Sequence, residues 1–103
     1  MRPGSDAEQA LSLLGMARRA RVLMVGQDRV FAAIKDGGEL FIVTSADCSR
    51  NVLRKVLSSN CETLVAEDFS RESLGIAVGV MNAQIVALPY GSGFVKKLKE
   101  LLK

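Results

Sequence analysis

Four short apolar runs with the residue preferences of β-strands alternate with helical patterns along the 103 residues of the chain. The runs lie at residues 22–25, 40–43, 63–66 and 83–88. One helical pattern precedes the first run, and another follows each run after a short connection. Strands that alternate with helices predict a mostly parallel sheet between two helical layers. No linker or low-complexity tract interrupts the pattern, so we expect one domain over residues 1–103.

Capping and turn residues predict where the helices begin and end. Ser5 and Glu8 form a capping box for a first helix that runs to about Arg19. Ser45 or Asp47 is expected to cap the third helix. The other predicted boundaries are Asp28 with Gly37 and Gly38 for the second helix, Ser70 to Ala77 for the fourth, and a Gly-Ser-Gly start at 91–93 for the fifth. The apolar stripes are Val52, Leu53, Val56 and Leu57 in the third helix and Phe94, Val95, Leu98, Leu101 and Leu102 in the fifth.

The residues that usually carry catalysis or bind metals are scarce in this sequence. It contains no histidine, which removes the usual general base and the commonest metal ligand. The two cysteines, Cys48 and Cys61, are too few for a disulfide scaffold and lack partners for a zinc site. Cys48 precedes a predicted helix, where a thiol pKa can fall, but no neighbour supplies a base. We therefore expect no enzymatic activity, no metal and no cofactor.

Two features bear on the compartment. Residues 1–6 are not followed by the apolar segment typical of a secretion signal, and no apolar run approaches the roughly 20 residues of a membrane span. Two isolated cysteines are typical of reduced thiols. The sequence therefore predicts a cytoplasmic protein with no membrane partner.

The small net charge of +3 is unevenly distributed. Between residues 18 and 29, Arg18, Arg19, Arg21 and Arg29 face a single acid, Asp28. One interpretation is a phosphate-binding surface, in which these arginines lie beside the N–H groups at the start of the second helix. The other is that Arg18 and Arg19 complement the dipole at the end of the first helix. Charge alone leaves both interpretations open.

Other basic and glycine-rich segments have simpler explanations. The last helix carries Lys96, Lys97, Lys99 and Lys103 with one acid, Glu100, which is typical of a solvated face. Arg50, Arg54 and Lys55 are expected on the solvated face of the third helix. The Gly-Ser-Gly at 91–93 favours a tight helix start over a phosphate site.

Several segments, in this order and spacing, resemble one family. They are LLGMARRA at 13–20, Gly26, Ala33 with Ile34, Gly37, the run 40–43, SAD at 45–47, SRESLGIAVG at 70–79, the run 83–88 and F-x-K-K-L at 94–98. From Gln9 to Lys103 the chain resembles the bacterial relatives of the kink-turn-binding ribosomal proteins of the large subunit. The resemblance implies a three-layer α-β-α sandwich with a four-stranded mixed sheet. It also implies a monomeric ribonucleoprotein component whose partner is ribosomal or other structured RNA, with the ribosome as a further partner.

The resemblance also implies where RNA would bind. The family contacts RNA through a G-x-N-E-x-x-K pattern at the start of the second helix, which here falls on Gly26, Asp28, Arg29 and Ala32. Apolar residues of the loop before the last strand pack on an extruded base in this family. The candidate RNA-contacting residues are Arg18, Arg19, Arg21, Gly26, Gln27, Asp28, Arg29, Ala32, Lys35, Val80, Met81 and Asn82.

The pattern departs from the family at the positions that contact base edges. Asp28 stands for an amide that both donates and accepts, Arg29 for a carboxylate, and Ala32 for a lysine. The usual Ala-Gly-Lys before the first strand is Ala20-Arg21-Val22 here. Two functions therefore stay open: an RNA-binding protein that relies on phosphate contacts, and a protein-interaction module that has lost kink-turn recognition. A third function, an enzyme or a small-ligand domain, is supported only by residues 91–93 and Cys48.

Overall fold

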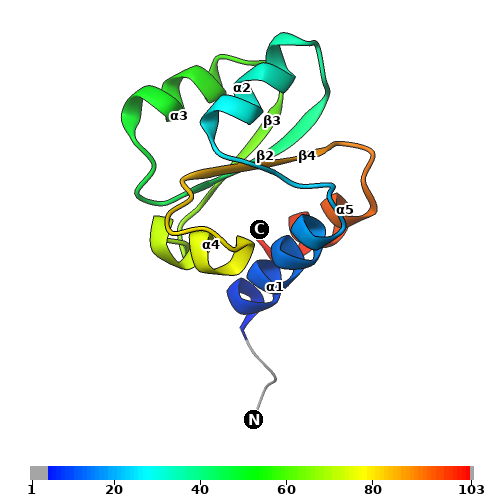
Figure 1. Ribbon diagram of the computed structural model, residues 1–103, viewed down its shortest axis with the longest axis vertical. Coiled ribbons are helices and arrows are strands. Elements are labelled where there is room, and N and C mark those ends of the chain that lie inside the picture. The colour runs from blue at the N-terminus through cyan, green and yellow to red at the C-terminus, as the bar shows by residue number, and fades with distance from the viewer. Residues whose placement is uncertain (1–4, 103) are drawn as a thin grey trace.

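The predicted alternation of helices and strands is confirmed. A computed structural model describes residues 5–102, and Figure 1 shows the chain. The elements are α1 (Asp6–Arg19), β1 (Met24–Val25), α2 (Gln27–Lys35), β2 (Leu40–Ser45), α3 (Arg50–Leu57), β3 (Glu62–Ala66), α4 (Arg71–Val78), β4 (Ile85–Pro89) and α5 (Gly93–Leu101). Two predictions fall partly outside the described residues. They concern residues 1–4 of the N-terminal segment and Lys103 of the last basic block.

The four strands form one mixed sheet in the order β1-β4-β2-β3. β2 and β3 are parallel, whereas β4 runs antiparallel to both β1 and β2. The mixed sheet implied by the family resemblance is confirmed, and the mostly parallel sheet predicted from the alternation is wrong. The reason lies in residues 79–84, which fold back along α4 until the Ala83 N–H bonds to the Arg71 carbonyl at 3.0 Å. β4 therefore begins at the edge where β3 ends.

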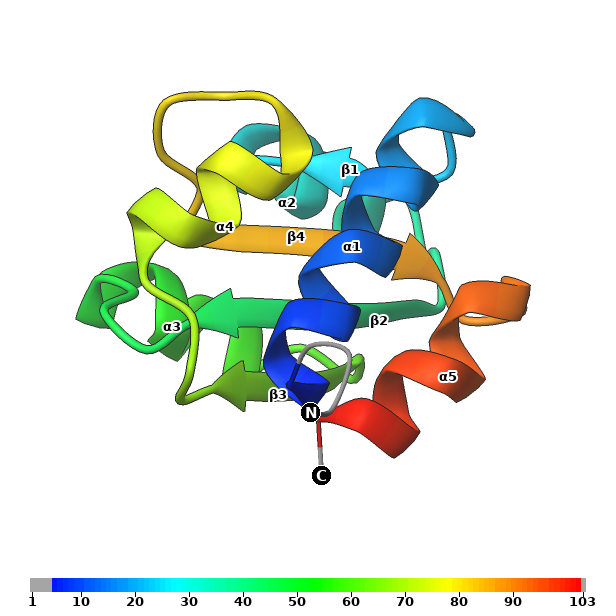
Figure 2. The ribbon, with the colours of Figure 1, turned by 90° about the horizontal axis from the view of Figure 1, so that it is seen from below.

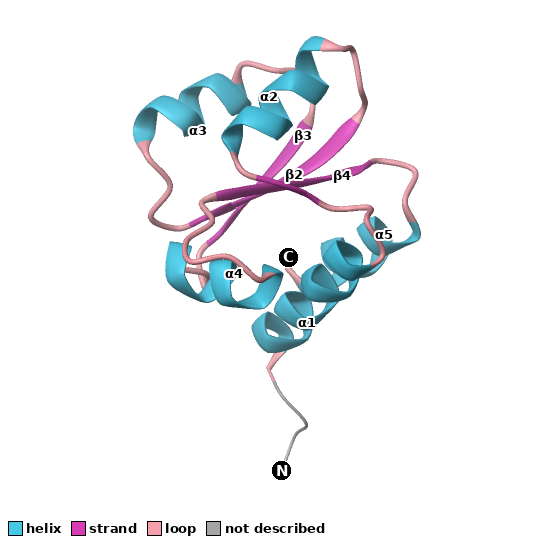
Figure 3. Cartoon of the chain, in the orientation of Figure 1, coloured by secondary structure: helices cyan, strands magenta, loops and turns pink. Residues whose placement is uncertain are grey.

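Helices cover both faces of the sheet and make the three-layer sandwich that the resemblance implies. α1, α4 and α5 lie on one face, and α2 and α3 lie on the other (Figure 3). The alternation of side chains along β2 supplies both cores, because Phe41 and Val43 face the first layer while Leu40 and Ile42 face the second. This central strand is buried along its whole length.

Several predicted boundaries shift, and the third helix shifts most. Ser49 caps α3 in place of Ser45 or Asp47, with a 3.4 Å bond from the Val52 N–H to its hydroxyl. Ser45 instead ends β2, because that strand continues between β3 and β4 beyond its apolar run. The helix therefore starts later than expected, and Leu57 is 59% exposed although the stripe placed it inward.

The first and last strands are shorter than their apolar runs. The N–H groups of Val22 and Leu23 both bond to the Ala17 carbonyl, so these residues belong to the end of α1 and β1 begins at Met24. In the run at residues 83–88, the Ala83 N–H bonds to the Arg71 carbonyl of α4, and β4 begins at Ile85. In both cases a helix terminus takes the backbone groups that a longer strand would need.

Candidate nucleic-acid interface

One edge of the sheet gathers the two segments that the resemblance singled out. β1, β2 and β3 end at this edge and β4 begins there. The Gly26 N–H bonds to the Ile85 carbonyl at 3.0 Å, so the start of α2 lies beside the end of the α4–β4 loop, residues 79–84. Figure 2 shows α2 behind β1 and the loop to its left. Residues 26–29 and 80–82, far apart in sequence, thus share one surface, which we call the α2–loop surface.

The start of α2 is built differently from the other helix starts of the described chain. Serine hydroxyls cap α1, α3, α4 and α5, whereas α2 begins at Gly26 with no side-chain cap. Gly26 has a φ of +94°, a conformation that glycine tolerates and other residues rarely adopt. The first-turn N–H groups thus have no side-chain acceptor, which is the usual arrangement of an anion-binding helix start.

Side chains around this helix start are mostly exposed and of mixed charge. Gln27, Asp28 and Arg29 are exposed in the first turn, and Ala32 is exposed one turn later. Arg29 adds a positive charge to this first turn, whereas the Asp28 carboxylate opposes an anion there. Lys35 lies in the last turn of α2, at the opposite end of the helix from Gly26.

The α4–β4 loop is held in place by close backbone packing on α4. A Cβ on Gly75 would lie 2.7 Å from the Met81 carbonyl oxygen and 2.9 Å from the Asn82 Cα, so only glycine permits this contact. The Val80 N–H also bonds to the Gly75 carbonyl at 2.9 Å. On this fixed loop the Met81 side chain is 87% exposed, and Asn82 is exposed beside it. The loop therefore presents an apolar side chain and an amide to solvent.

Two further residues, Gln84 and Arg71, make contacts at this edge that the sequence does not predict. The Gln84 side chain accepts a 2.8 Å bond from the Ser49 N–H and ties the loop to the start of α3. Arg71 donates from its backbone N–H to the Asp47 carboxylate and from its Nε to the Asp47 carbonyl, both at 2.9 Å. No local motif marks these contacts, which join residues 24 to 35 positions apart.

The other arginines do not lie at the helix start, which corrects the sequence interpretation. Arg18, Arg19 and Arg21 are exposed at the α1–β1 connection, at the opposite end of β1 from Gly26. The five residue-to-residue steps from Arg21 to Gly26 span at most about 18 Å. Arg18 and Arg19 occupy the last turn of α1, so the dipole interpretation fits both. These arginines lie at one end of β1 and the α2–loop surface lies at the other, so the arginines are not part of that surface.

Arg21 holds a backbone conformation that glycine normally supplies. α1 ends in a Schellman motif, in which the Arg21 N–H bonds to the Arg18 carbonyl and the Val22 N–H to the Ala17 carbonyl, each at 3.0 Å. Arg21 fills the left-handed position with a φ of +61°, and no other non-glycine residue in the described chain has a positive φ. Glycine takes this conformation at the ends of α2 and α4, as Gly37 and Gly79. Arg21 therefore holds the backbone in a conformation that costs less free energy with glycine.

Replacing Arg21 with glycine is expected to raise the free energy of unfolding by about 0.5–1 kcal/mol, because the left-handed strain disappears. Urea unfolding measures the change. Arg21→Ala is the matched control, since it removes the same charge but keeps the Cβ and hence the strain. A glycine variant no more stable than the alanine variant would contradict the strain.

Comparison with known proteins places the chain in a family. No protein-family model matches it. RNA-binding protein YlxQ of Bacillus subtilis (strain 168) is 32% identical over 93 residues, which cover 87% of this chain and 91% of that protein. RNA-binding protein YlxQ of Enterococcus faecium is 31% identical over 100 residues, 95% of each chain. The chain belongs to the YlxQ family.

Solved structures agree with this assignment. A Bacillus halodurans protein of unknown function matches this YlxQ family member with a TM-score of 0.78 at 31% identity, over 91% of this chain and 96% of that one. A 15.5kD RNA binding protein of Giardia lamblia matches with a TM-score of 0.71 at 14% identity, over 99% and 88% of the two chains, and shows the same fold. The resemblance is confirmed as membership of the YlxQ family, and the fold that it implies is confirmed as well.

The other features weighed in the sequence take plainer roles in this YlxQ family member. Burial raises the pKa of the Cys48 thiol, which corrects the idea that a helix start activates it. The Ser92 hydroxyl accepts the Phe94 N–H at 3.2 Å, so residues 91–93 make a capped helix start. The described residues hold no group of three or more potential metal-ligating His, Cys, Asp or Glu side chains. Among residues 5–102, no helix is both long and apolar enough to span a membrane.

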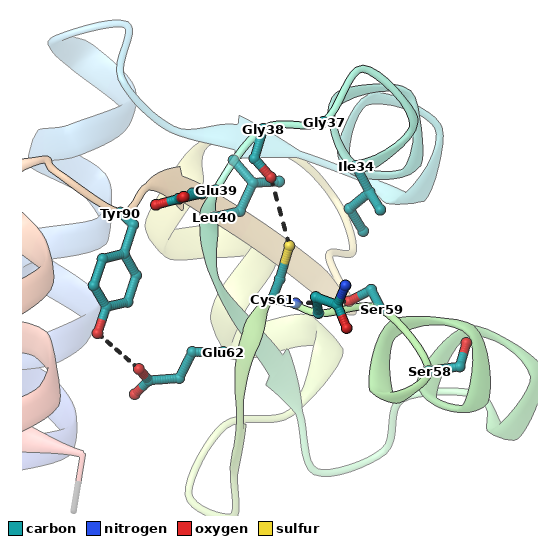
Figure 4. A pocket seen from close by; sticks show the side chains of 11 residues that line it. Ile34, Gly37, Gly38, Glu39, Leu40, Ser58, Ser59, Cys61, Glu62 and Tyr90 are labelled. Carbon is teal, nitrogen blue, oxygen red and sulfur yellow. Dashed lines mark hydrogen bonds between the residues drawn. The ribbon is translucent and has the colours of Figure 1, made fainter.

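A cleft of about 680 Å³ lies at the opposite end of the sheet, between the α2–β2 turn and the start of β3 (Figure 4). Several of its polar groups already have partners. The Cys61 thiol lies 3.7 Å from the Gly38 carbonyl, and the Tyr90 hydroxyl donates to the Glu62 carboxylate at 2.9 Å. Lys99 of α5 also binds Glu62, at 3.0 Å, so part of the expected solvated face instead holds α5 to the sheet. This cleft is separate from the α2–loop surface.

The Glu62–Lys99 pair predicts a small dependence of stability on pH. Hydrogen bonds from Lys99 and then Tyr90 lower the pKa of Glu62, so its contribution is present at neutral pH and is lost as the pH falls below about 4. Glu62→Gln is therefore expected to lower the Tm at pH 7, by an amount that shrinks on acidification. Thermal unfolding across pH measures this, with Glu100→Gln as the control. A difference independent of pH would contradict it.

Proposed function

We propose that this YlxQ family member binds structured RNA through the α2–loop surface and catalyses no reaction. The observation that carries the proposal is the uncapped start of α2, flanked by Arg29 and by a loop fixed at Gly75. The curated relatives, at 31–32% identity over nearly the whole chain, are named RNA-binding proteins. An uncapped helix start with an adjacent guanidinium suits a phosphate, and an exposed methionine on a fixed loop suits an unstacked base.

Each part of the surface has a proposed role in this interaction. The first-turn N–H groups of α2 and Arg29 bind one phosphate, and Gly26 allows the backbone to approach it closely. Val80 and Met81 pack on an extruded base, while Asn82 and Gln27 offer hydrogen bonds to base edges. The short side chain of Ala32, on the same helix, leaves space for the RNA backbone. Arg18, Arg19, Arg21 and Lys35 bind phosphates farther along the RNA.

The same proposal extends to the protein's setting. Residues 1–103 act as one domain and as a monomer in the cytoplasm, in a ribonucleoprotein particle with ribosomal or other kink-turn-like RNA, where the ribosome is a further partner. Asp28, Arg29 and Ala32 depart from the base-reading pattern, so recognition relies on RNA shape and phosphates more than on sheared G·A pairs.

Salt dependence tests the proposal. Arg21→Ala with Arg29→Ala is expected to weaken binding to a kink-turn RNA by about tenfold, and to reduce the slope of log K against log salt by about 2, because two phosphate contacts are lost. Fluorescence anisotropy over a salt series measures both quantities. Lys96→Ala with Lys97→Ala removes the same charge from α5 and is expected to leave both unchanged. Failure of the unaltered protein to bind kink-turn or ribosomal RNA at low salt would contradict the proposal.

A protein-interaction module is the second candidate, favoured by the same three departures from the base-reading pattern. Affinity purification with nuclease treatment separates the two functions. The RNA-binding function predicts that the captured partners are lost on treatment. A protein partner that persists, together with an absence of RNA binding at low salt, would favour the module.

A further inference from the structure

The exposed face of α3 carries positive charge that no carboxylate neutralises in the described chain. Arg50, Arg54 and Lys55 are exposed, and this helix of eight residues contains no acid. Val52 and Val56 bury the opposite side, which fixes the orientation of the basic face. None of the three cations forms an ion pair within 4.0 Å in the described chain.

The lysines of α5 provide a contrast. Lys99 is held by Glu62 at 3.0 Å, and Lys97 lies 4.0 Å from Glu100. On α3, by comparison, the Lys55 Nζ lies over the Phe31 ring of α2, 5.7 Å from its centre, a cation–π contact that leaves the ammonium without a carboxylate partner in the described chain. The α3 face is therefore a patch of unpaired cations, and a polyanion is its natural partner.

This patch begins where the α2–loop surface ends. Gln84, the last residue of the α4–β4 loop, accepts the Ser49 N–H through its side chain at 2.8 Å and the Ser45 N–H through its carbonyl at 3.0 Å. Arg50 follows Ser49 directly, and Arg54 lies on the same helix face about 6 Å farther along the axis. Figure 2 shows the loop and α3 on the same side of the molecule. An RNA strand leaving the loop would meet Arg50 first.

We propose that the exposed face of α3 binds the phosphate backbone of the RNA beyond the segment held by the α2–loop surface. The inference rests on the proposed function, because continuity with that surface identifies the polyanion as the same RNA. Arg50 and Arg54 contact successive stretches of backbone, and Lys55 supplies a third cation toward α2. The contact carries no sequence information and lengthens the footprint of the protein on a stem that flanks the bound segment.

RNAs of two lengths test this extension. The probes are a kink-turn RNA with short flanking stems and the same RNA with both stems lengthened. Arg50→Gln with Arg54→Gln is expected to weaken binding to the long RNA by about tenfold and to lower its salt slope by about 2, at roughly threefold in affinity per lost phosphate contact. Binding to the short RNA is expected to stay within about twofold of the unaltered protein, because those two phosphate contacts form only on the longer stem.

Lys96→Gln with Lys97→Gln is the matched control, since it removes two exposed cations from α5 and is expected to change neither RNA complex. Thermal unfolding confirms that both double variants are folded. Equal affinity and salt slope of the α3 variant and the unaltered protein on the long RNA would overturn the extension and leave the proposed function intact. An unaltered protein that binds neither RNA would overturn both.

Discussion

Replacing Gly75 with alanine is expected to lower the free energy of unfolding by about 1–3 kcal/mol and to weaken RNA binding by about tenfold or more. The added Cβ would lie 2.7 Å from the Met81 carbonyl oxygen and 2.9 Å from the Asn82 Cα, and both are backbone atoms that no side-chain rotation can move away. The α4–β4 loop must therefore lift off α4. Val80, Met81 and Asn82 then leave their places beside the start of α2.

Urea unfolding and RNA anisotropy at a temperature where the variant is folded separate the two effects. Gly93→Ala is the matched control, because it is also a glycine in a helix but its Cβ would meet no atom within 4 Å. We expect it to be neutral or slightly stabilising and to bind RNA normally. A folded Gly75→Ala protein with the affinity of the unaltered protein would mean that the loop takes no part in binding.

A second large effect is expected from restoring the family pattern on α2. Asp28→Asn, Arg29→Glu and Ala32→Lys together supply the amide, the carboxylate and the lysine that the pattern carries. The change leaves the net charge of the protein unaltered, because Asp28→Asn and Ala32→Lys each raise it by one and Arg29→Glu lowers it by two. Base-edge contacts are worth roughly 1–3 kcal/mol each by analogy with DNA. The triple variant is therefore expected to prefer a kink-turn RNA over an RNA without sheared G·A pairs by at least about tenfold more than the unaltered protein does.

The comparison uses a kink-turn RNA and the same RNA with its sheared G·A pairs replaced by Watson–Crick pairs. The unaltered protein is expected to bind the two within about threefold, because phosphate contacts dominate its affinity. If the unaltered protein already prefers the kink-turn RNA by tenfold, then Asp28 and Arg29 contact base edges themselves. The proposal that recognition relies on RNA shape and phosphates would then be wrong.

Features of this fold that depend on interactions between residues close in sequence can be predicted from the sequence. Ser5 and Ser70 cap α1 and α4 as their spacing predicts, and the buried run of β2 appears as a strand. The direction of β4 has no local signal, because it depends on a loop that folds back over Gly75. The cap of α3 lies later in the chain than the sequence predicts, because the sheet, and not the apolar run, determines where β2 ends.

The candidate site divides in the same way. The start of α2 and the α4–β4 loop were identified through the family resemblance, and the bond from Gly26 to Ile85 brings them together. The arginines of the α1–β1 connection lie farther from Gly26 than the sequence interpretation implies, because β1 lies between them. The roles of Gln84 and Arg71 cannot be predicted from the sequence, since they depend on contacts between residues far apart in the chain.

An NMR titration of the ¹⁵N-labelled protein with a kink-turn RNA at low salt tests the RNA-binding surface most directly. We expect the amide signals of residues 26–29 and 80–82 to shift first and most. Those around the cleft of Gly38, Cys61 and Tyr90, at the opposite end of the sheet, are expected to stay in place. Shifts centred on that cleft, or no shifts at low salt, would show that the α2–loop surface does not bind RNA.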